Sequence, residues 1–197
     1  MMHMPKWQNF LVITQQPIFT PEQCDAIIDI GRKEKIQEAK IGNSEYNNNA
    51  RLDYSTRITN ISFIPFDKIP PMYNKLEEVI NNINLNHFMF DGVKLNELAQ
   101  YTEYNKGGFY DWHMDSHIAG IESPTNRKIS MTCLLSDPSE FEGGDLFFSE
   151  VNKGKSPIKL KRGQAVFFAS FLRHKVDTVT KGNRKSLVVW FGGPPFK

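Results

Sequence analysis

The second half of the chain constrains the fold most, because short strand-like segments follow one another there with turn signals between them. Stretches rich in Gly, Asn or charged residues, at 105–108, 142–144 and 181–183, separate segments rich in β-branched and aromatic side chains. The expected strands cover residues 95–104, 109–115, 128–136, 145–149, 157–160, 164–169, 173–180 and 185–191. About eight short strands at this spacing predict an antiparallel sandwich or a jelly roll.

The first half of the chain predicts helices instead. Thr20 is a good N-cap, Pro21 suits the first helical position, and Gln23 completes a capping-box pattern. A second helix is expected over about residues 71–84, where apolar side chains recur at helical spacing, and a strand over 57–64. The fold class predicted is therefore mainly β with N-terminal helices (α+β), around a double-stranded β-helix, or jelly-roll, core.

Length and composition fit one domain over residues 1–197, with helical support and further strands in 1–94 and the jelly-roll core in 95–197. A net charge of +2 gives no case for nucleic-acid binding. Two cysteines far apart, Cys24 and Cys133, form no disulfide framework and fit a reducing compartment. No apolar run of about 18 residues predicts a membrane span, so we expect a cytoplasmic protein.

The motif His113-x-Asp115 lies at the end of an expected strand, where residues i and i+2 point to the same side. His174 lies on a later strand of the same β region. Two histidines and one carboxylate on one face of an octahedron leave three positions open, which is the arrangement used by non-haem iron(II). His113, Asp115 and His174 are therefore the candidate metal ligands.

Each of these residues also has a simpler interpretation. A lone His-x-Asp is more often a surface turn, and a lone strand histidine is more often satisfied by a hydrogen bond. His117 follows His113 by four residues, which would make a metal pair on a helix, but the strand pattern argues against that. Glu142 and Asp145 are carboxylates in a glycine-rich turn and read as structural.

Arg184 strengthens the metal hypothesis, because it follows His174 by ten residues on the next expected strand. Its planar guanidinium suits a bidentate grip on a carboxylate. The alternative is a solvated basic turn that includes Lys181 and Lys185. That alternative does not explain the apolar run at 187–191 that follows directly.

Four ordered motifs resemble the prolyl 4-hydroxylase-like group of iron/2-oxoglutarate oxygenases, above all its PKHD-type branch. They lie at residues 104–115, 127–146, 163–168 and 174–190. The resemblance implies that His113, Asp115 and His174 bind Fe(II) and act in catalysis. It also implies that Arg184 binds the distal carboxylate of 2-oxoglutarate and that Tyr104 donates a hydrogen bond to this cosubstrate.

The same resemblance places Tyr110, Trp190 and Arg57 on the substrate side of the site. It implies Fe(II), 2-oxoglutarate and O₂ as cofactors and cosubstrates, with ascorbate as a further candidate. By analogy, the Asn-rich loop at 42–50 would close over a peptide substrate.

The function that the resemblance implies is a 2-oxoglutarate-dependent dioxygenase that hydroxylates a proline-containing protein or peptide. Two alternatives stay open. The same core could hydroxylate a free amino acid or another small metabolite, or the chain could be a non-enzymatic jelly-roll binding module. The intact His113, Asp115, His174 and Arg184 set disfavours the binding module, because a degenerate member would be expected to lose one of them.

Overall fold

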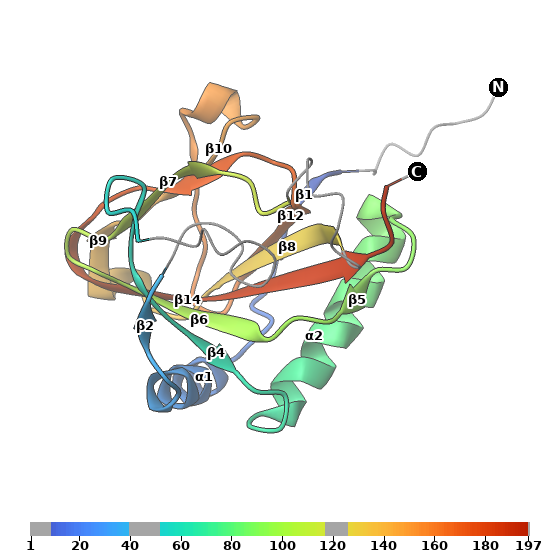
Figure 1. Ribbon diagram of the computed structural model, residues 1–197, viewed down its shortest axis with the longest axis horizontal. Helices are drawn as coiled ribbons and strands as arrows, with labels where there is room; N and C mark the ends of the chain where they lie inside the picture. Colours follow the sequence, from blue (N-terminus) through green and yellow to red (C-terminus); the bar gives the residue numbers. More distant parts are fainter. Residues whose placement is uncertain (1–8, 40–51, 117–125, 197) are drawn as a thin grey trace.

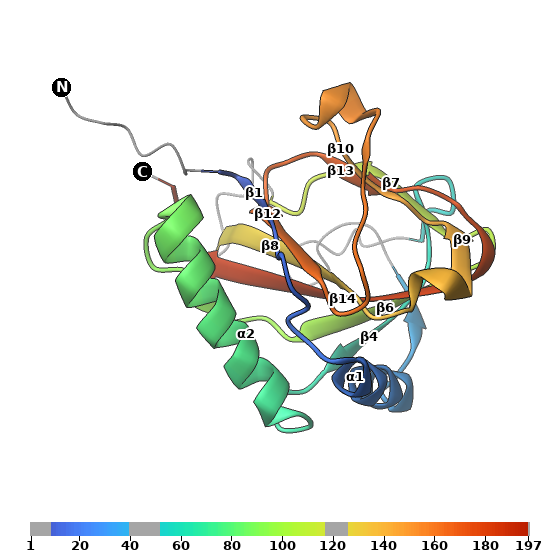
Figure 2. The ribbon, with the colours of Figure 1, turned by 180° about the vertical axis from the view of Figure 1, so that it is seen from behind.

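The computed structural model describes residues 9–39, 52–116 and 126–196. In this part of the chain two antiparallel sheets lie face to face, and two helices cover the outer face of the larger sheet (Figures 1 and 2). The fold is thus mainly β with helical cover, as the sequence predicts, and its double-sheet core is the jelly roll.

The larger sheet has nine strands in the described residues, and β14 lies near its centre. The main path of this sheet runs β1 (Leu11–Ile13), β12 (Ala165–Ala169), β8 (Asn126–Leu134), β14 (Val179–Gly193), β6 (Ala99–Asn105), β4 (Asn60–Ile64) and β2 (Gln37–Glu38). Two further strands pair with β14, namely β5 (Lys94–Leu95) and β9 (Phe141–Gly143).

The smaller sheet has five strands in the described residues. Their order is β11 (Pro157–Ile158), β10 (Leu146–Phe148), β13 (His174–Val176), β7 (Phe109–His113) and β3 (Arg57–Ile58). Two short 3₁₀ helices lie in the connections, η2 (Pro138–Glu140) and η3 (Asn152–Gly154).

The two expected helices are confirmed. Helix α1 spans Pro21–Lys33, and the side chain of Thr20 accepts a hydrogen bond from the backbone N–H of Gln23 while the Gln23 side chain accepts one from Thr20. This is the reciprocal capping box that the sequence predicts. Helix α2 spans Pro70–Ile83, and a π-helical turn, η1 (Asn84–Phe88), which the sequence did not indicate, extends it.

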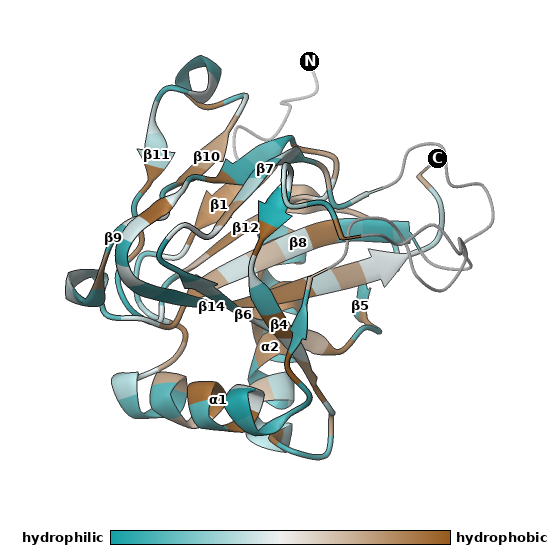
Figure 3. Cartoon of the chain, turned by 60° about the vertical axis from the view of Figure 1, so that its left-hand side comes forward, coloured by the Kyte–Doolittle hydropathy of each residue, from teal (hydrophilic) through white to brown (hydrophobic). Residues whose placement is uncertain are grey.

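Residues along the central strands alternate between two environments. Figure 3 shows hydrophobic and hydrophilic residues alternating along β8. On β14, Leu187 and Val189 pack in the core beneath the helices, whereas Arg184 and Ser186 point to the other face and hydrogen-bond to each other. The period of two that defines a strand thus directs Leu187 and Val189 toward the helices and Arg184 and Ser186 toward the smaller sheet.

Two elements have other boundaries than the sequence predicts. The strand expected over 57–64 divides at Thr59 into β3, which pairs with β7 in the smaller sheet, and β4, which pairs with β6 in the larger one. The turn expected at 181–183 lies inside the continuous strand β14. Gly182, at a φ of +72°, bends this strand without ending it, so that its start pairs with β9 and its remainder with β6.

The sequence also missed strands β1 and β2, which are two or three residues long and show no alternation of their own. The polar loop expected at 42–50 lies outside the described residues, as does His117. Among the helices of the described ranges, none has the length and apolar character needed to cross a bilayer. The expected cytoplasmic location stays a prediction.

The packing of α1 on the larger sheet gives a stability prediction at Gly31. A Cβ on Gly31 would lie 2.5 Å from Cγ of the buried Tyr101 ring. We expect Gly31→Ala to lower the free energy of unfolding by about 1–3 kcal/mol through overpacking, despite the better helix propensity of alanine. Thermal unfolding checks this, with Asp29→Ala on the exposed face of α1 as the control. An unfolding midpoint at or above that of the wild type would contradict the packing argument.

Candidate metal centre

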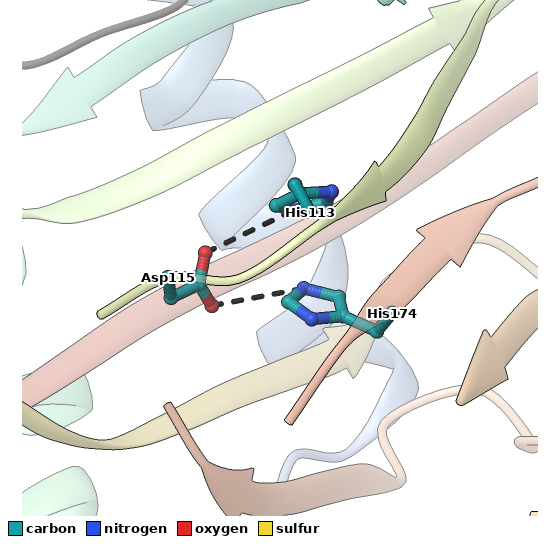
Figure 4. A group of neighbouring side chains, drawn as sticks. All are labelled: His113, Asp115 and His174. Carbon is teal, nitrogen blue, oxygen red and sulfur yellow. Dashed lines mark ion pairs between the residues drawn. The ribbon is translucent and has the colours of Figure 1, made fainter. Parts of the chain in front are cut away.

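Neighbouring strands of the smaller sheet bring the two candidate histidines together. His113 ends β7 and His174 begins β13; the two residues are direct partners in the antiparallel ladder, with ring centroids 4.2 Å apart. Asp115 follows two residues after β7 ends, and its backbone N–H donates to the carbonyl of Ser170 at 3.0 Å. Figure 4 shows the Asp115 carboxylate facing both imidazoles.

The ligand atoms of His113, Asp115 and His174 all lie within 4.8 Å of one another. Nε2 of His113 is 3.8 Å from one carboxylate oxygen of Asp115, and Nε2 of His174 is 3.7 Å from the other. The three side chains are at most 14% exposed. The His-x-Asp spacing therefore does bring both side chains to one point, although Asp115 itself lies beyond the strand.

The hydrogen bonds of the two imidazoles define which nitrogen is free. Nδ1 of His113 lies 2.7 Å from the carbonyl oxygen of Asp111, and Nδ1 of His174 lies 3.0 Å from that of Leu172. A carbonyl only accepts, so each Nδ1 must carry a proton, and in the neutral ring the lone pair is then on Nε2. Both lone pairs point toward the Asp115 carboxylate, as metal ligation requires.

Burial and neighbouring groups shift the pKa values of His113 and Asp115. Burial, together with the neighbouring His174, lowers the pKa of His113 to about 3, so its imidazole is neutral at physiological pH. Burial alone would raise the pKa of Asp115, but the two histidines and Arg127 outweigh it and hold this pKa below the ordinary value. Imidazole nitrogens together with an ionised carboxylate are a donor set that suits Fe(II).

Tyr110 and Arg57 form a stack that ends on the metal ligands. The Tyr110 ring lies parallel to the His113 ring with centroids 3.4 Å apart, and the Arg57 guanidinium carbon lies 4.3 Å from the Tyr110 centroid. Nε of Arg57 is buried without a hydrogen-bond partner among the described residues. The Tyr110 ring therefore lies between the positively charged guanidinium of Arg57 and the imidazole of His113.

Arg184 lies on β14, on the face of the larger sheet that is turned toward the smaller sheet. Its side chain is 3% exposed, donates from Nη1 to Ser186 Oγ at 3.2 Å, and lies 5.6 Å from the ring centroid of its strand partner Tyr104. Burial lowers the pKa of Arg184 from its usual value. Because Arg184 is buried, the structure excludes its interpretation as a solvated surface charge. No carboxylate of the described residues forms an ion pair with it.

The glycine pair at 143–144 is what leaves room for Arg184. Gly144 adopts a φ of +65°, and a Cβ there would lie 2.8 Å from Cδ of Arg184 and 2.9 Å from Cγ2 of Val179. The sequence predicted a tight turn at these glycines. The structure instead places Gly143 at the end of strand β9, and Gly144, which follows the strand, passes directly against the arginine.

Trp190 forms the other side of the site together with a residue that the sequence analysis did not single out. The Arg127 guanidinium stacks on the Trp190 ring at 3.8 Å and makes a bidentate ion pair with Glu97. Nε1 of Trp190 is buried without a partner among the described residues. Arg127 has no motif spacing that marks it, because its neighbours in the site come from three other segments of the chain.

Comparison with known proteins places this arrangement in a class. Residues 99–192 match the family model of the 2OG-Fe(II) oxygenase superfamily. This segment includes all three candidate metal ligands as well as Tyr104 and Arg184. This part of the chain is therefore similar to the 2OG-Fe(II) oxygenase superfamily.

Within that class the similar curated proteins are PKHD-type hydroxylases. One from Shewanella frigidimarina is 36% identical over 93 residues, covering 46% of this chain and 41% of the relative. Another from Hyphomonas neptunium is 28% identical over 128 residues, covering 61% of this chain and 55% of the relative. The chain thus spans about half the length of these relatives.

Solved structures show the same fold at low sequence identity. A Pseudomonas putida prolyl-4-hydroxylase superposes with a TM-score of 0.71 at 18% identity, covering 94% of both chains. A Trichoplax adhaerens prolyl hydroxylase, in complex with a peptide fragment of the hypoxia inducible factor oxygen degradation domain, gives 0.70 at 15% identity and covers 93% of this chain and 83% of its own.

Proposed function

We propose that this chain is an Fe(II)/2-oxoglutarate-dependent dioxygenase. The observation that carries the proposal is the pairing of two features within one barrel. One is the cluster of the buried His174 with the half-buried His113 and Asp115, and the other is a buried Arg184 without a carboxylate partner among the described residues. A metal-binding module alone would explain the first feature but would leave the second as an uncompensated charge.

Each residue then has a role in the proposed reaction. His113, Asp115 and His174 hold Fe(II) at one face, and Arg184 binds the distal carboxylate of 2-oxoglutarate through its guanidinium. Bound Fe(II) and 2-oxoglutarate supply the oxidation, in which decarboxylation of 2-oxoglutarate to succinate activates O₂ for hydroxylation. The aromatic walls of the barrel, Phe148 and Phe168 beside His174, exclude water from this centre.

We propose a protein or peptide substrate that contains proline, and a single dioxygenase domain over residues 1–197. The support is structural similarity, because two solved structures with this fold are prolyl hydroxylases, one of them in complex with a peptide fragment. The proposed substrate-side residues are Arg57, Tyr110 and Trp190. Two of them carry a buried donor without a partner among the described residues, namely Nε of Arg57 and Nε1 of Trp190. A substrate carbonyl oxygen would satisfy such a donor. Ascorbate stays a prediction.

The alternative substrate is a free amino acid or another small metabolite, which the same core could hydroxylate. Succinate release measured across proline-containing peptides and free amino acids distinguishes the two. We expect release above the uncoupled background with peptides only. Release stimulated by a free amino acid alone would replace the peptide proposal. No 2-oxoglutarate turnover and no Fe(II) binding would favour the non-enzymatic binding module.

Tyr104 gives a prediction about the cosubstrate. This side chain is 3% exposed and lies opposite Arg184 on the neighbouring strand. Tyr104→Phe should raise the KM for 2-oxoglutarate by roughly 2- to 13-fold, because one neutral hydrogen bond contributes about 0.5–1.5 kcal/mol. Titration of 2-oxoglutarate under saturating Fe(II) measures this. A loss of Fe(II) binding with an unchanged KM would contradict the role given to Tyr104.

A further inference from the structure

The indole of Trp190 carries a buried hydrogen-bond donor on the inner face of β14. Its side chain is 7% exposed, and Nε1 has no hydrogen-bond partner within residues 9–39, 52–116 and 126–196. Trp190 lies an even number of residues from Arg184, so both side chains face the smaller sheet, whereas Val189 packs in the core beneath the helices. A buried donor without an acceptor is unfavourable, which makes this N–H a candidate contact for a ligand.

Short contacts connect Trp190 with the metal cluster. Trp190 is the direct cross-strand partner of Ser130 on β8. The Ser130 hydroxyl lies 2.9 Å from that of Ser170, whose carbonyl accepts from the backbone N–H of Asp115 at 3.0 Å. Arg184 precedes Trp190 by six residues, which is about 20 Å along a strand that rises about 3.3 Å per residue. The indole and the proposed cosubstrate anchor therefore lie at different ends of the site.

A bulge in β8 brings Arg127 over the indole. The register between β14 and β8 shifts before Gly192, which pairs with Arg127 and leaves Lys128 as an extra residue on β8. A β-bulge changes the side to which the neighbouring side chains point. The guanidinium carbon of Arg127 lies 3.8 Å from the ring centroid of Trp190, so the cation covers one face of the indole.

Glu97 fixes the orientation of this guanidinium. Nε and Nη2 of Arg127 donate to the two carboxylate oxygens of Glu97 at 2.8 and 2.5 Å. Two parallel hydrogen bonds of this kind fix the plane of the guanidinium, which a single bond would leave free to turn. The segment that carries Glu97 passes close to Gly192, where a Cβ would lie 2.9 Å from Oδ1 of Asn96.

We propose that Glu97 and Arg127 are positioning residues that hold the Trp190 indole in place, so that its N–H meets an acceptor of the substrate. In a peptide this acceptor is a backbone carbonyl oxygen. Arg127 covers the ring, and Glu97 both orients Arg127 and neutralises its charge, so that a neutral acceptor fits beside it. The inference rests on the proposed function and adds to it two residues that set substrate affinity.

The first measurement is made on a protein in which Trp190 is the only tryptophan, obtained with Trp7→Phe and Trp112→Phe. Acrylamide quenching of its fluorescence reports how well the indole is covered. Glu97→Gln keeps the shape of the side chain but weakens its hold on Arg127, so we expect quenching to increase.

The second measurement is succinate release with the proline-containing peptide that gives the highest rate in the panel. Glu97→Gln should raise the KM for this peptide by about 2- to 30-fold, the range that corresponds to the loss of a cation–π contact. The KM for 2-oxoglutarate and the affinity for Co(II) should stay at their wild-type values. A general loss of structure would move all three quantities together.

Variants of Arg127 separate the charge from the fork. Arg127→Met loses both and should act at least as strongly as Glu97→Gln, whereas Arg127→Lys keeps the charge and should have a smaller effect. Asp25→Asn is the matched control, because it removes a carboxylate partner of Arg162 at helix α1. It should change neither quenching nor any KM.

A folded Glu97→Gln protein with the quenching and the peptide KM of Asp25→Asn would overturn the proposal. An equal rise in the KM for 2-oxoglutarate would overturn it as well. If Glu97→Gln does not fold, unchanged values in Arg127→Met have the same consequence. If the wild type turns over no peptide, the proposed peptide substrate is refuted, and unchanged quenching would separately overturn the positioning of Trp190.

Discussion

Replacing Arg184 with alanine should raise the KM for 2-oxoglutarate by roughly 30-fold to several thousand-fold while Fe(II) binding stays intact. Losing a buried, charge-assisted arginine–carboxylate pair is expected to cost about 2–5 kcal/mol of affinity, and each 1.4 kcal/mol is about tenfold. The structure supports the upper part of this range, because Arg184 is 3% exposed and has no competing carboxylate partner among the described residues.

Two further variants sharpen this prediction. Arg184→Lys should be partly tolerated, since lysine keeps the charge, but it loses the fork that grips both carboxylate oxygens. Lys181→Ala removes a cation from the same strand, and this lysine is 75% exposed and paired with Glu142. We therefore expect Lys181→Ala to leave the KM unchanged. The measurement is 2-oxoglutarate titration with iron loading checked in parallel.

An unchanged KM in a fully iron-loaded Arg184→Ala protein would remove the cosubstrate assignment. A parallel loss of iron would instead show that Arg184 supports the fold of the barrel. Gly144 explains how such a loss could arise, because the arginine stem fills the space beside that glycine. The two outcomes are separated by comparing the thermal unfolding of the metal-free variants.

Features with a local physical cause could be predicted from the sequence. The capping box at Thr20 needs only residues three apart, and the His113 and Asp115 pair needs only the period of a strand. Arg184 was predicted from its spacing to His174 and the resemblance of the surrounding motif. The structure confirms the capping box, brings His113 and Asp115 to one point and buries Arg184, whereas the roles of these site residues with metal and cosubstrate stay proposals.

Features that depend on strand partners could not be predicted in this way. The sheet change at Thr59 is set by two different neighbours, β7 and β6, which begin 50 and 40 residues after Thr59 (109 − 59 and 99 − 59). Arg127 contacts Glu97 and Trp190, and the hydroxyl of Ser130 hydrogen-bonds to that of Ser170. No residue within one segment signals such contacts, because tertiary pairing overrides local pattern.

Replacing Asp115 with alanine should abolish turnover, and it should weaken metal binding by more than about 100-fold. Removing even an outer hydrogen-bond partner of a ligand weakens metal binding about 10- to 100-fold, so removing the ligand itself must do more. Co(II) titration and succinate release measure the two effects. Asp67→Ala, at an exposed position before α2, is the control and should change neither.

The Asp115→Ala protein should nevertheless stay folded. The fold is held by a fully buried apolar core of helices and sheet, whereas a zinc finger depends on its ion for folding. The metal-free variant should unfold near the wild-type temperature, because the apolar core that holds the fold does not include Asp115. Asp115→Asn keeps the shape but not the charge, so it should bind Co(II) more weakly than the wild type does. Normal succinate production by a well-folded Asp115→Ala protein would refute the catalytic assignment of the His113, Asp115 and His174 cluster.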